Sequence, residues 1–154
     1  MKITPEQFEL LLPLACAWAE RQEGIILRDG ELLNDSELDD ARTLKINCPE
    51  KVRLLSVDQI PQPDDPVLMA AADMTQLITP FTIGLTLRYG IFIRSGCRND
   101  RRLIVHELVH TSQYERLDGF LPFLKQYLHE CLSIGYPHAP LEQEAITKAK
   151  ELVD

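Results

Sequence analysis

Apolar residues recur at helical spacing near the start of the chain and again throughout its last third. Over residues 5–22 they fall on one face of a helix, with Thr4 as the N-cap and Pro5 at the first helical position. In the last third, the same spacing predicts three helices: from a cap at Asn99 or Asp100 to about residue 115, from about residue 119 to 133, and from Pro140 to the last residue.

The middle of the chain has a mixed pattern. A cap at Asp35 or Ser36 predicts a short helix through Leu44, and residues 67–76 predict another. Residues 51–57, "KVRLLSV", predict a strand, and two β-rich runs around residues 88–90 predict either one bent strand or a tight hairpin. This order predicts a single α+β domain over residues 1–154, in which a small N-terminal or central sheet packs against a helical lobe.

Composition narrows the classes of partner. The net charge of -8, with 16 Lys and Arg against 24 Asp and Glu, argues against binding to nucleic acid or to an anionic membrane surface. The apolar start contains Pro13 and follows acidic Glu6 and Glu9 rather than a basic cluster, so we expect an amphipathic helix instead of a signal peptide. We therefore expect a cytoplasmic protein, with its four cysteines reduced.

The segment "RRLIVHELVH" (101–110) carries the clearest chemical signal. On a helix, His106 and His110 are one turn apart and face the same way, so both imidazoles can bind one metal ion. Glu107 is offset from that face and can reach an attacking water, which is where the general base of a hydrolase must lie. The flanking residues are apolar, which predicts a buried helix with a Zn²⁺ site.

An alternative explanation needs no metal. The two histidines could be satisfied by backbone groups while Glu107 pairs with Arg101 or Arg102. Three polar groups at ligand spacing on an apolar helix favour the metal instead, because one ion would satisfy all of them.

A catalytic zinc site usually has a third protein ligand, and five residues downstream are candidates: His129, Glu130, His138, Glu142 and Glu144. The last helix has its apolar face at Leu141, Ala145, Ile146, Ala149, Leu152 and Val153. Glu142 shares this face, whereas Glu144 falls on the opposite, solvated face and is expected to pair with Lys148. The helical phase therefore favours Glu142 over Glu144 as the third ligand.

The stretch "HELVHTSQYE", an amphipathic helix and then "PLEQEA" together resemble a compact glutamate-zincin core. The chain is similar over residues 85–149 to the metallopeptidase domain associated with extracellular contractile injection systems, which has HEL-x-H-x-x-Q followed by E-x-E-A. More distant zincins, including the prenyl-protein and heat-shock membrane proteases, have H-E-x-x-H with a later E-x-x-A. The resemblance implies a zincin-like fold with His106, His110 and Glu142 as zinc ligands and Glu107 as the base. Residues 1–80 carry no part of the resemblance.

The resemblance also implies a function, a zinc metallopeptidase that acts on a peptide or protein substrate. A strand over residues 85–93 would align that substrate by main-chain hydrogen bonds, unless it is a plain core strand. A non-catalytic, zinc-binding interaction module on the same scaffold is the alternative function. Gln113 lies three residues after His110 and is a candidate to orient its imidazole. Five side chains are candidate donors to the oxyanion: Tyr114, Tyr127, His129, Tyr136 and His138.

Overall fold

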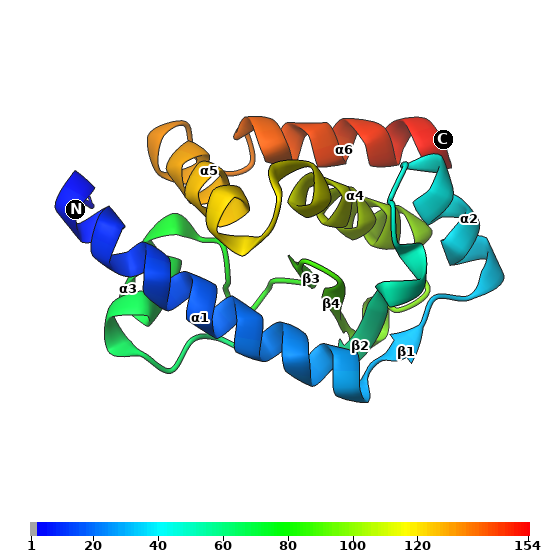
Figure 1. Cartoon of the computed structure of the whole chain (residues 1–154), viewed down its shortest axis with the longest axis horizontal. Helices are drawn as coiled ribbons and strands as arrows, with labels where there is room; N and C mark the ends of the chain where they lie inside the picture. The colour runs from blue at the N-terminus through cyan, green and yellow to red at the C-terminus, as the bar shows by residue number, and fades with distance from the viewer. Residues whose placement is uncertain (1–2) are drawn as a thin grey trace.

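The computed structural model describes residues 3–154, and in that range the chain forms six α-helices and a four-stranded sheet (Figure 1). The predicted α+β class is therefore confirmed. The helices are α1 (Pro5–Asp29), α2 (Asp35–Thr43), α3 (Pro66–Thr75), α4 (Arg101–Leu117), α5 (Phe120–Ser133) and α6 (Pro140–Val153). The strands are β1 (Glu31–Leu32), β2 (Arg53–Val57), β3 (Gly84–Leu87) and β4 (Gly90–Arg94), and short 3-10 turns lie at Pro49–Lys51 and Ser95–Cys97.

Side-chain caps fix where the helices begin. Thr4 caps α1 in a reciprocal pair with Gln7, as the sequence predicts for the cap, and Asp100 caps α4. The cap of α2 is Asn34 rather than Asp35 or Ser36, because its side chain accepts the backbone N–H of Glu37. The predicted helix at 67–76 begins and ends one residue earlier, and its cap is Asp65.

Helix α1 is longer than predicted, since it continues past residue 22 to Asp29. Its second half has a buried face at Glu23 and Ile26, and this tertiary packing extends the helix through Gly24. Pro13 lies inside the helix without ending it. Within residues 3–154, no helix combines the length and apolar character needed to cross a membrane.

The sheet has the strand order β1-β2-β4-β3, with β2 parallel to β4 and the other neighbouring pairs antiparallel. The two β-rich runs predicted around residues 88–90 form a hairpin, turning at Arg88, whose φ is 63°. Gly90 opens β4 under α1, where a Cβ would lie 2.9 Å from the Cβ of Ile26. Strand β4 is internal, so in the predicted segment 85–93 only the β3 residues lie on a sheet edge.

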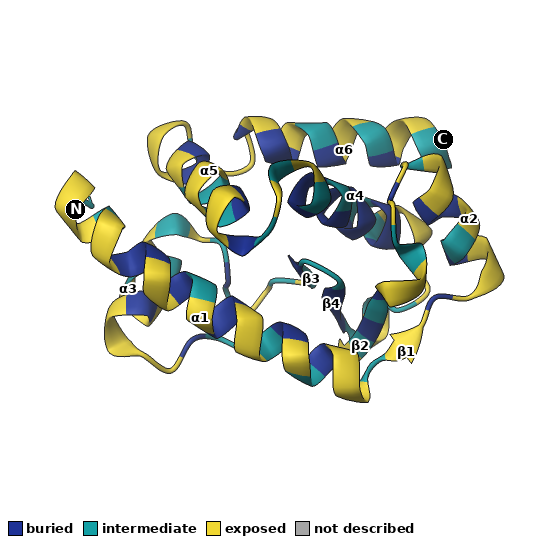
Figure 2. Ribbon diagram, in the orientation of Figure 1, coloured by how far each residue is buried: buried dark blue, intermediate teal, exposed yellow. Residues whose placement is uncertain are grey.

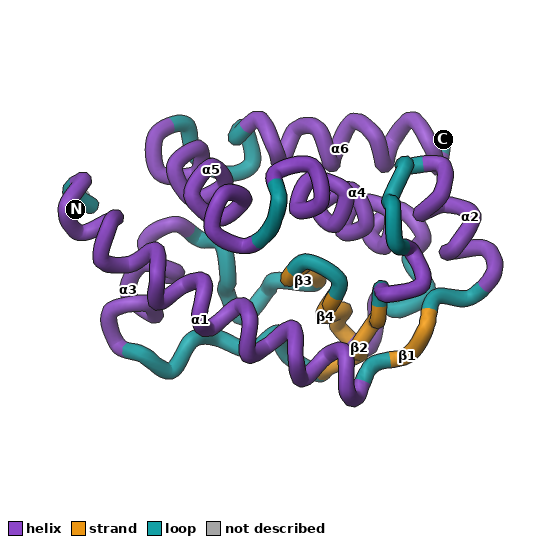
Figure 3. Tube along the Cα trace, in the orientation of Figure 1, coloured by secondary structure: helices purple, strands orange, loops and turns teal. Residues whose placement is uncertain are grey.

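The sheet is the middle layer of the molecule, with α1 on one face and α4 on the other (Figure 3). Leu87 and Phe92 pack with residues of α1, whereas Leu54, Ile91 and Ile93 pack with Ile104 and Leu108 of α4. Helix α6 packs along the outer side of α4, and Figure 2 shows α4 as mostly buried. The helix that carries H-E-x-x-H is therefore enclosed between the sheet and α6.

A buried ion pair joins α1 to the hairpin. Glu23, only 3% exposed, accepts two hydrogen bonds from the Arg88 guanidinium at 2.8 and 2.9 Å and a third from the Tyr89 N–H at 3.1 Å. The guanidinium also lies 4.7 Å from the ring centre of Phe120, at the start of α5. These contacts hold the hairpin in a fixed position between α1 and α4.

Candidate metal centre

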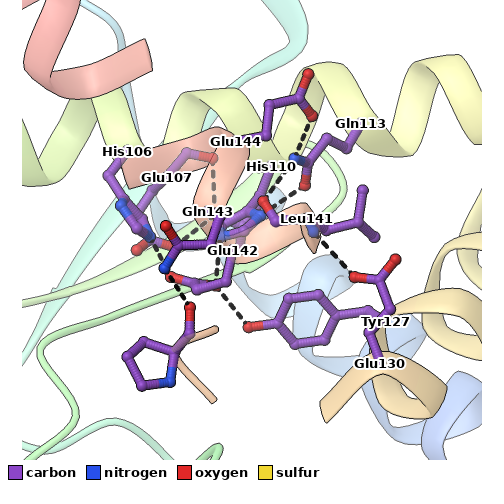
Figure 4. Close-up of polar contacts among 12 residues, drawn as sticks. His106, Glu107, His110, Gln113, Tyr127, Glu130, Leu141, Glu142, Gln143 and Glu144 are labelled. Carbon is purple, nitrogen blue, oxygen red and sulfur yellow. Dashed lines mark hydrogen bonds and ion pairs between the residues drawn. The ribbon is translucent and has the colours of Figure 1, made fainter. Parts of the chain in front are cut away.

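Three side chains that the sequence singles out meet in one place (Figure 4). His106 and His110 come from α4 and Glu142 from the first turn of α6. The Nε2 of His106 lies 2.6 Å from one carboxylate oxygen of Glu142, and the Nε2 of His110 lies 3.1 Å from the other. One potential ligand atom from each residue lies within 4.8 Å of the other two, so the cluster can hold a metal ion.

The predicted inward position of Glu142 is confirmed, because it is 2% exposed and faces α4, whereas Ile146, predicted on the same apolar face, is exposed. The other candidate third ligands lie outside this cluster, which is the one such group found within the described part of the chain. Glu130 instead accepts the backbone N–H of Leu141 at 2.9 Å and so fixes the start of α6 against α5. His129 is exposed and packs its ring edge-on against Phe8, and His138 is also exposed.

The predicted partner of His110 is also in place. The Nδ1 of His110 lies 2.8 Å from Oε1 of Gln113, and Nε2 of the same amide donates to the Leu141 carbonyl at 2.9 Å and to Glu144 at 2.7 Å. Because the two acceptors fix which end of the amide is the donor, Oε1 must accept a hydrogen bond from the Nδ1–H of His110. This arrangement directs Nε2 of His110 toward Glu142 as the metal-binding nitrogen.

Glu144 has a larger role than its predicted exposed pair with Lys148. That pair exists at 3.2 Å, but Glu144 is only half-exposed and also accepts Arg116 at 2.9 and 3.1 Å. The Arg116 hydrogen bonds, together with those from Gln113 and Lys148, outweigh burial and lower the pKa of Glu144 to about 2. A permanently charged Glu144 therefore holds the Gln113 amide, which in turn orients His110.

Burial and charge act in opposite directions on the two buried partners. Burial disfavours the charged form of His110, but hydrogen bonding to Glu142 and the charges of Glu107 and Glu142 raise its pKa to about 9. Burial likewise disfavours the charged form of Glu142, yet its hydrogen bonds with His106 and His110 hold its pKa well below the usual value. Without metal, the folded chain thus holds a carboxylate against an imidazolium.

Glu107 lies beside the cluster but takes no part in it. Its Oε1 lies 2.7 Å from the Thr86 hydroxyl, which is also 2.9 Å from the Glu107 carbonyl oxygen. Gly84 precedes Thr86 by two residues on the same face of β3, and a Cβ there would lie 3.0 Å from Oε2 of Glu107. Strand β3 therefore sets the position of this carboxylate, with a hydroxyl on one side and the space left by a glycine on the other.

The metal-free alternative for this helix is wrong as stated. Arg101 pairs with Asp40 at 2.9 Å and Arg102 pairs with Asp154, so neither arginine contacts Glu107. The histidine Nε2 atoms are directed at Glu142 and not at backbone carbonyls.

The five candidate hydrogen-bond donors occupy different places. Tyr127 donates to Glu142 at 2.8 Å, and burial together with the Glu142 charge raises its pKa well above the usual value. Tyr114 is in the core, with its hydroxyl 3.4 Å from the Thr86 carbonyl. Tyr136 borders the same cavity as the cluster, and burial with the charges of Glu142 and Glu107 raises its pKa to about 12. His129 and His138 do not border that cavity.

A cavity of about 830 Å³ opens beside the cluster. His106, Glu107, His110 and Glu142 form one part of its wall, and all four residues of β3 border it. Most of the remaining wall is apolar and comes from α1, α3, α5 and the segment between α3 and β3. A substrate in this cavity would reach both the cluster and Glu107.

The donor set fits a zinc ion. Two imidazole nitrogens and a carboxylate are the ligands of many catalytic zinc sites, and such ligand atoms lie roughly 3.3 Å apart around a tetrahedral ion. The Glu142 oxygens are 2.6 and 3.1 Å from the two nitrogens, so a small separation of α4 and α6 side chains would admit the ion. The Gln113 contact keeps the proton of His110 on Nδ1, so Nε2 is the nitrogen that would lose its proton to a metal.

Neither a scan against protein-family models nor searches of the curated proteins and of the solved structures found a match to this chain. The chemistry proposed for the site therefore rests on its own geometry.

The H-E-x-x-H motif does not predict two residues that position Glu107. Gly84 and Thr86 belong to a strand that is predicted from its apolar pattern, and nothing in that pattern pairs them with Glu107. Their spacing of two residues does place them on one face of the strand. Which face meets α4 depends on tertiary packing.

The metal-free chain should lose stability as the pH rises. The pKa of His110 is raised from 6.5 to about 9 on folding, so its contribution is full below pH 6.5 and disappears as the pH rises to 9. At about 1.4 kcal/mol per pKa unit, we expect the free energy of unfolding to fall by roughly 2–3 kcal/mol over that range. Urea unfolding in the presence of a chelator, at a series of pH values, measures this free energy.

The matched comparison is Glu142→Gln, which removes the charged hydrogen-bond partner that raises the pKa of His110 most and leaves the smaller effect of Glu107. This variant should show little dependence on pH between 6.5 and 9. His129→Gln, at an exposed position, should behave as the unaltered chain does. A flat profile in the unaltered chain would contradict the arrangement.

Proposed function

We propose that this protein is a zinc-dependent metallopeptidase on a zincin-like scaffold. The observation that carries the proposal is the placement of a separate, buried carboxylate, Glu107, beside the His106, His110 and Glu142 cluster at the wall of one cavity. Zinc-dependent hydrolysis needs a metal site and a base that is not itself a ligand, and these residues supply a candidate for each.

Zinc held by the three residues would act as a Lewis acid toward the scissile carbonyl and the attacking water. Glu107 takes the proton of that water. Its Oε1 is occupied by the Thr86 hydroxyl, so Oε2, on the Gly84 side, is the oxygen that accepts. Water adds to the carbonyl carbon, the C–N bond breaks, and Glu107 returns the proton to the leaving nitrogen.

The free edge of β3 supports a peptide as the substrate. The Arg94 N–H donates to the Ile83 carbonyl, and since backbone directions alternate along a strand, Gly84 and Thr86 face away from β4. The Thr86 carbonyl already has the Tyr114 hydroxyl nearby, at 3.4 Å. The N–H and carbonyl of Gly84 therefore offer the main pairing site for an extended peptide, next to Glu107.

Tyr136 is the proposed donor to the oxyanion. It borders the cavity, it is half-exposed, and its raised pKa of about 12 keeps its proton in place at neutral pH. Tyr127 and Tyr114 are less suited because their hydroxyls already contact Glu142 and the Thr86 carbonyl. A neutral donor is what a developing oxyanion requires.

Zinc affinity should separate the two glutamates of α6. Glu142→Ala removes one of three ligands and should weaken zinc binding on the order of 100-fold or more. Glu144→Ala leaves the ligands intact but frees the Gln113 amide, so we expect a loss of roughly 10-fold, as for other residues that orient a ligand. Competition with a chromogenic chelator measures both affinities.

Lys148→Ala is the control, because it removes only the 3.2 Å contact with Glu144 and leaves Arg116 in place. Its zinc affinity should equal that of the unaltered chain. Equal zinc retention by Glu142→Ala and Lys148→Ala would sink the proposed ligand set.

Glu107→Gln should separate an enzyme from a binding module. Glutamine keeps an oxygen for the Thr86 hydroxyl but cannot take a proton, so peptide hydrolysis should fall roughly 1000-fold while zinc remains bound. Cleavage of a peptide library by mass spectrometry and zinc by elemental analysis give the two readings. Glu151→Gln, exposed on α6, is the matched control. A chain that binds zinc and cleaves nothing would instead favour the non-catalytic interaction module.

Tyr136→Phe should lower kcat roughly 100-fold with little change in KM or in zinc affinity, because it removes a hydrogen bond formed only in the transition state. Tyr127→Phe provides the contrast. It removes the 2.8 Å contact with Glu142 and should change zinc affinity instead. The assignment fails if kcat is unchanged in Tyr136→Phe.

A further inference from the structure

The cavity has two chemically distinct ends. One end carries the cluster, Glu107 and the edge of β3. The other end is apolar and is formed mainly by the first 80 residues, which contribute Leu11, Ala15, Trp18, Leu68, Ala72 and Ile78. A bound molecule would thus place a polar group at the cluster and an apolar group between α1 and α3.

Helix α3 has an unusual exposure for its composition. Its sequence, PVLMAAADMT, is mostly apolar, yet Leu68 is its one buried residue, and Val67, Met69 and Met74 are exposed. The residues of α3 that border the cavity are Leu68, Ala71, Ala72 and Thr75, so Met69 and Met74 lie outside its lining. Helix α3 therefore presents mainly small and apolar side chains to the cavity.

Large apolar side chains also stand exposed around the opening of the cavity. Phe81 is 83% exposed, and Ile83, Leu132 and Tyr136 are each more than a third exposed. These residues come from both sides, two from the segment before β3 and two from α5 and the segment that follows it. Such a group of exposed apolar residues around a cavity is typical of a binding site.

We propose that α1 and α3 form the selectivity element of the protein, binding the large apolar side chains of an extended peptide substrate on either side of the bond at the cluster. This inference rests on the proposed function and adds to it the class of substrate. It gives a role to residues 3–83, which lie outside the zincin resemblance, because they supply the larger part of the apolar wall, and α5 supplies the rest.

An extended peptide fits the observations better than a hydrocarbon chain does. The polar end of the cavity includes the outward-facing N–H and carbonyl of Gly84. These groups can hydrogen-bond to a peptide backbone, whereas the hydrocarbon of an acyl chain offers them no partner. Along an extended peptide paired to β3, alternate side chains point to opposite faces of the strand. Leu85 and Leu87 mark the face that meets α1, so alternate side chains of the peptide would enter the apolar end.

The test changes the size of the apolar end without touching the cluster. Ala72 faces the cavity and Ala70, two residues earlier in α3, is exposed outside it, so Ala72→Phe narrows the cavity and Ala70→Phe is the matched control. Peptides differing only in Phe, Leu or Ala beside the cleaved bond give kcat/KM for each chain. We expect Ala72→Phe to lower kcat/KM roughly 10- to 200-fold for the Phe and Leu peptides and less than about 3-fold for the Ala peptide.

Binding is measured separately in the zinc-loaded Glu107→Gln chain through Trp18, which borders the apolar end and is the one tryptophan of the sequence. Adding the Phe peptide should change the fluorescence emission of Trp18, and the change should saturate. The Ala peptide should bind at least about 10-fold more weakly. Decanoate is the hydrocarbon probe. Ala72→Leu replaces Ala72→Phe if the larger side chain lowers the unfolding temperature.

Each result decides a different point. Cleavage of all peptides at equal rates, with no selective loss in Ala72→Phe, overturns the inference and leaves hydrolysis standing. Saturable binding of the Phe peptide by a chain that cleaves nothing supports the apolar peptide site and overturns the hydrolase. Saturation by decanoate without peptide binding overturns the inference in favour of an acyl ligand.

Discussion

The contact of Glu142 with the two imidazoles of α4 is the constraint on which the arrangement of the helical lobe depends. A carboxylate that is 2% exposed cannot be left unpaired, because the free energy of desolvating a lone charge is larger than the stabilisation from packing one helix turn. The contact therefore fixes both the rotation of α6 and its height along α4. Glu130 reinforces it from α5 by accepting the Leu141 N–H one residue earlier, and Tyr127 adds a hydrogen bond to the carboxylate itself. Three helices are thus joined through the first turn of α6.

The same constraint explains why polar residues form a connected chain behind His110. Gln113 is fully buried and uses Nε2 and Oε1 together, and its partner Glu144 is neutralised by Arg116 and Lys148 near the surface. Each buried polar group in this series hydrogen-bonds to the next, and the series ends at the charged groups near the surface. The result is a histidine ring whose orientation, with Nε2 toward Glu142, is set before any metal binds. A ligand oriented in this way would lose little freedom on metal binding, which would raise affinity without adding contacts.

Local signals predicted the parts of this site that depend on helical geometry. The four-residue spacing of His106 and His110 and the phase of Glu142 follow from 3.6 residues per turn, and both are confirmed. Glu144 was predicted as the less favoured third ligand and as a surface partner of Lys148, since a helical wheel does not show that Arg116 and Gln113 of α4 lie opposite. The role of Thr86 and Gly84, the two-residue strand β1 and the full length of α1 depend on packing between segments far apart in the sequence. Pattern along the chain carries no information on such distances.

The two halves of α1 illustrate how packing and open space are divided in this fold. In its second half, Ile26 is fully buried against Gly90 and Glu23 binds Arg88, so the sheet is held firmly at that end. In its first half, Leu11, Ala15 and Trp18 are also buried in the core, and they border the cavity as well. Because the contacts of Glu23 with Arg88 and of Ile26 with Gly90 lie outside the cavity lining, a change in what fills the cavity need not disturb the register of β3 and β4. The position of Glu107 depends on β3, and so its geometry is insulated from variation in the apolar wall.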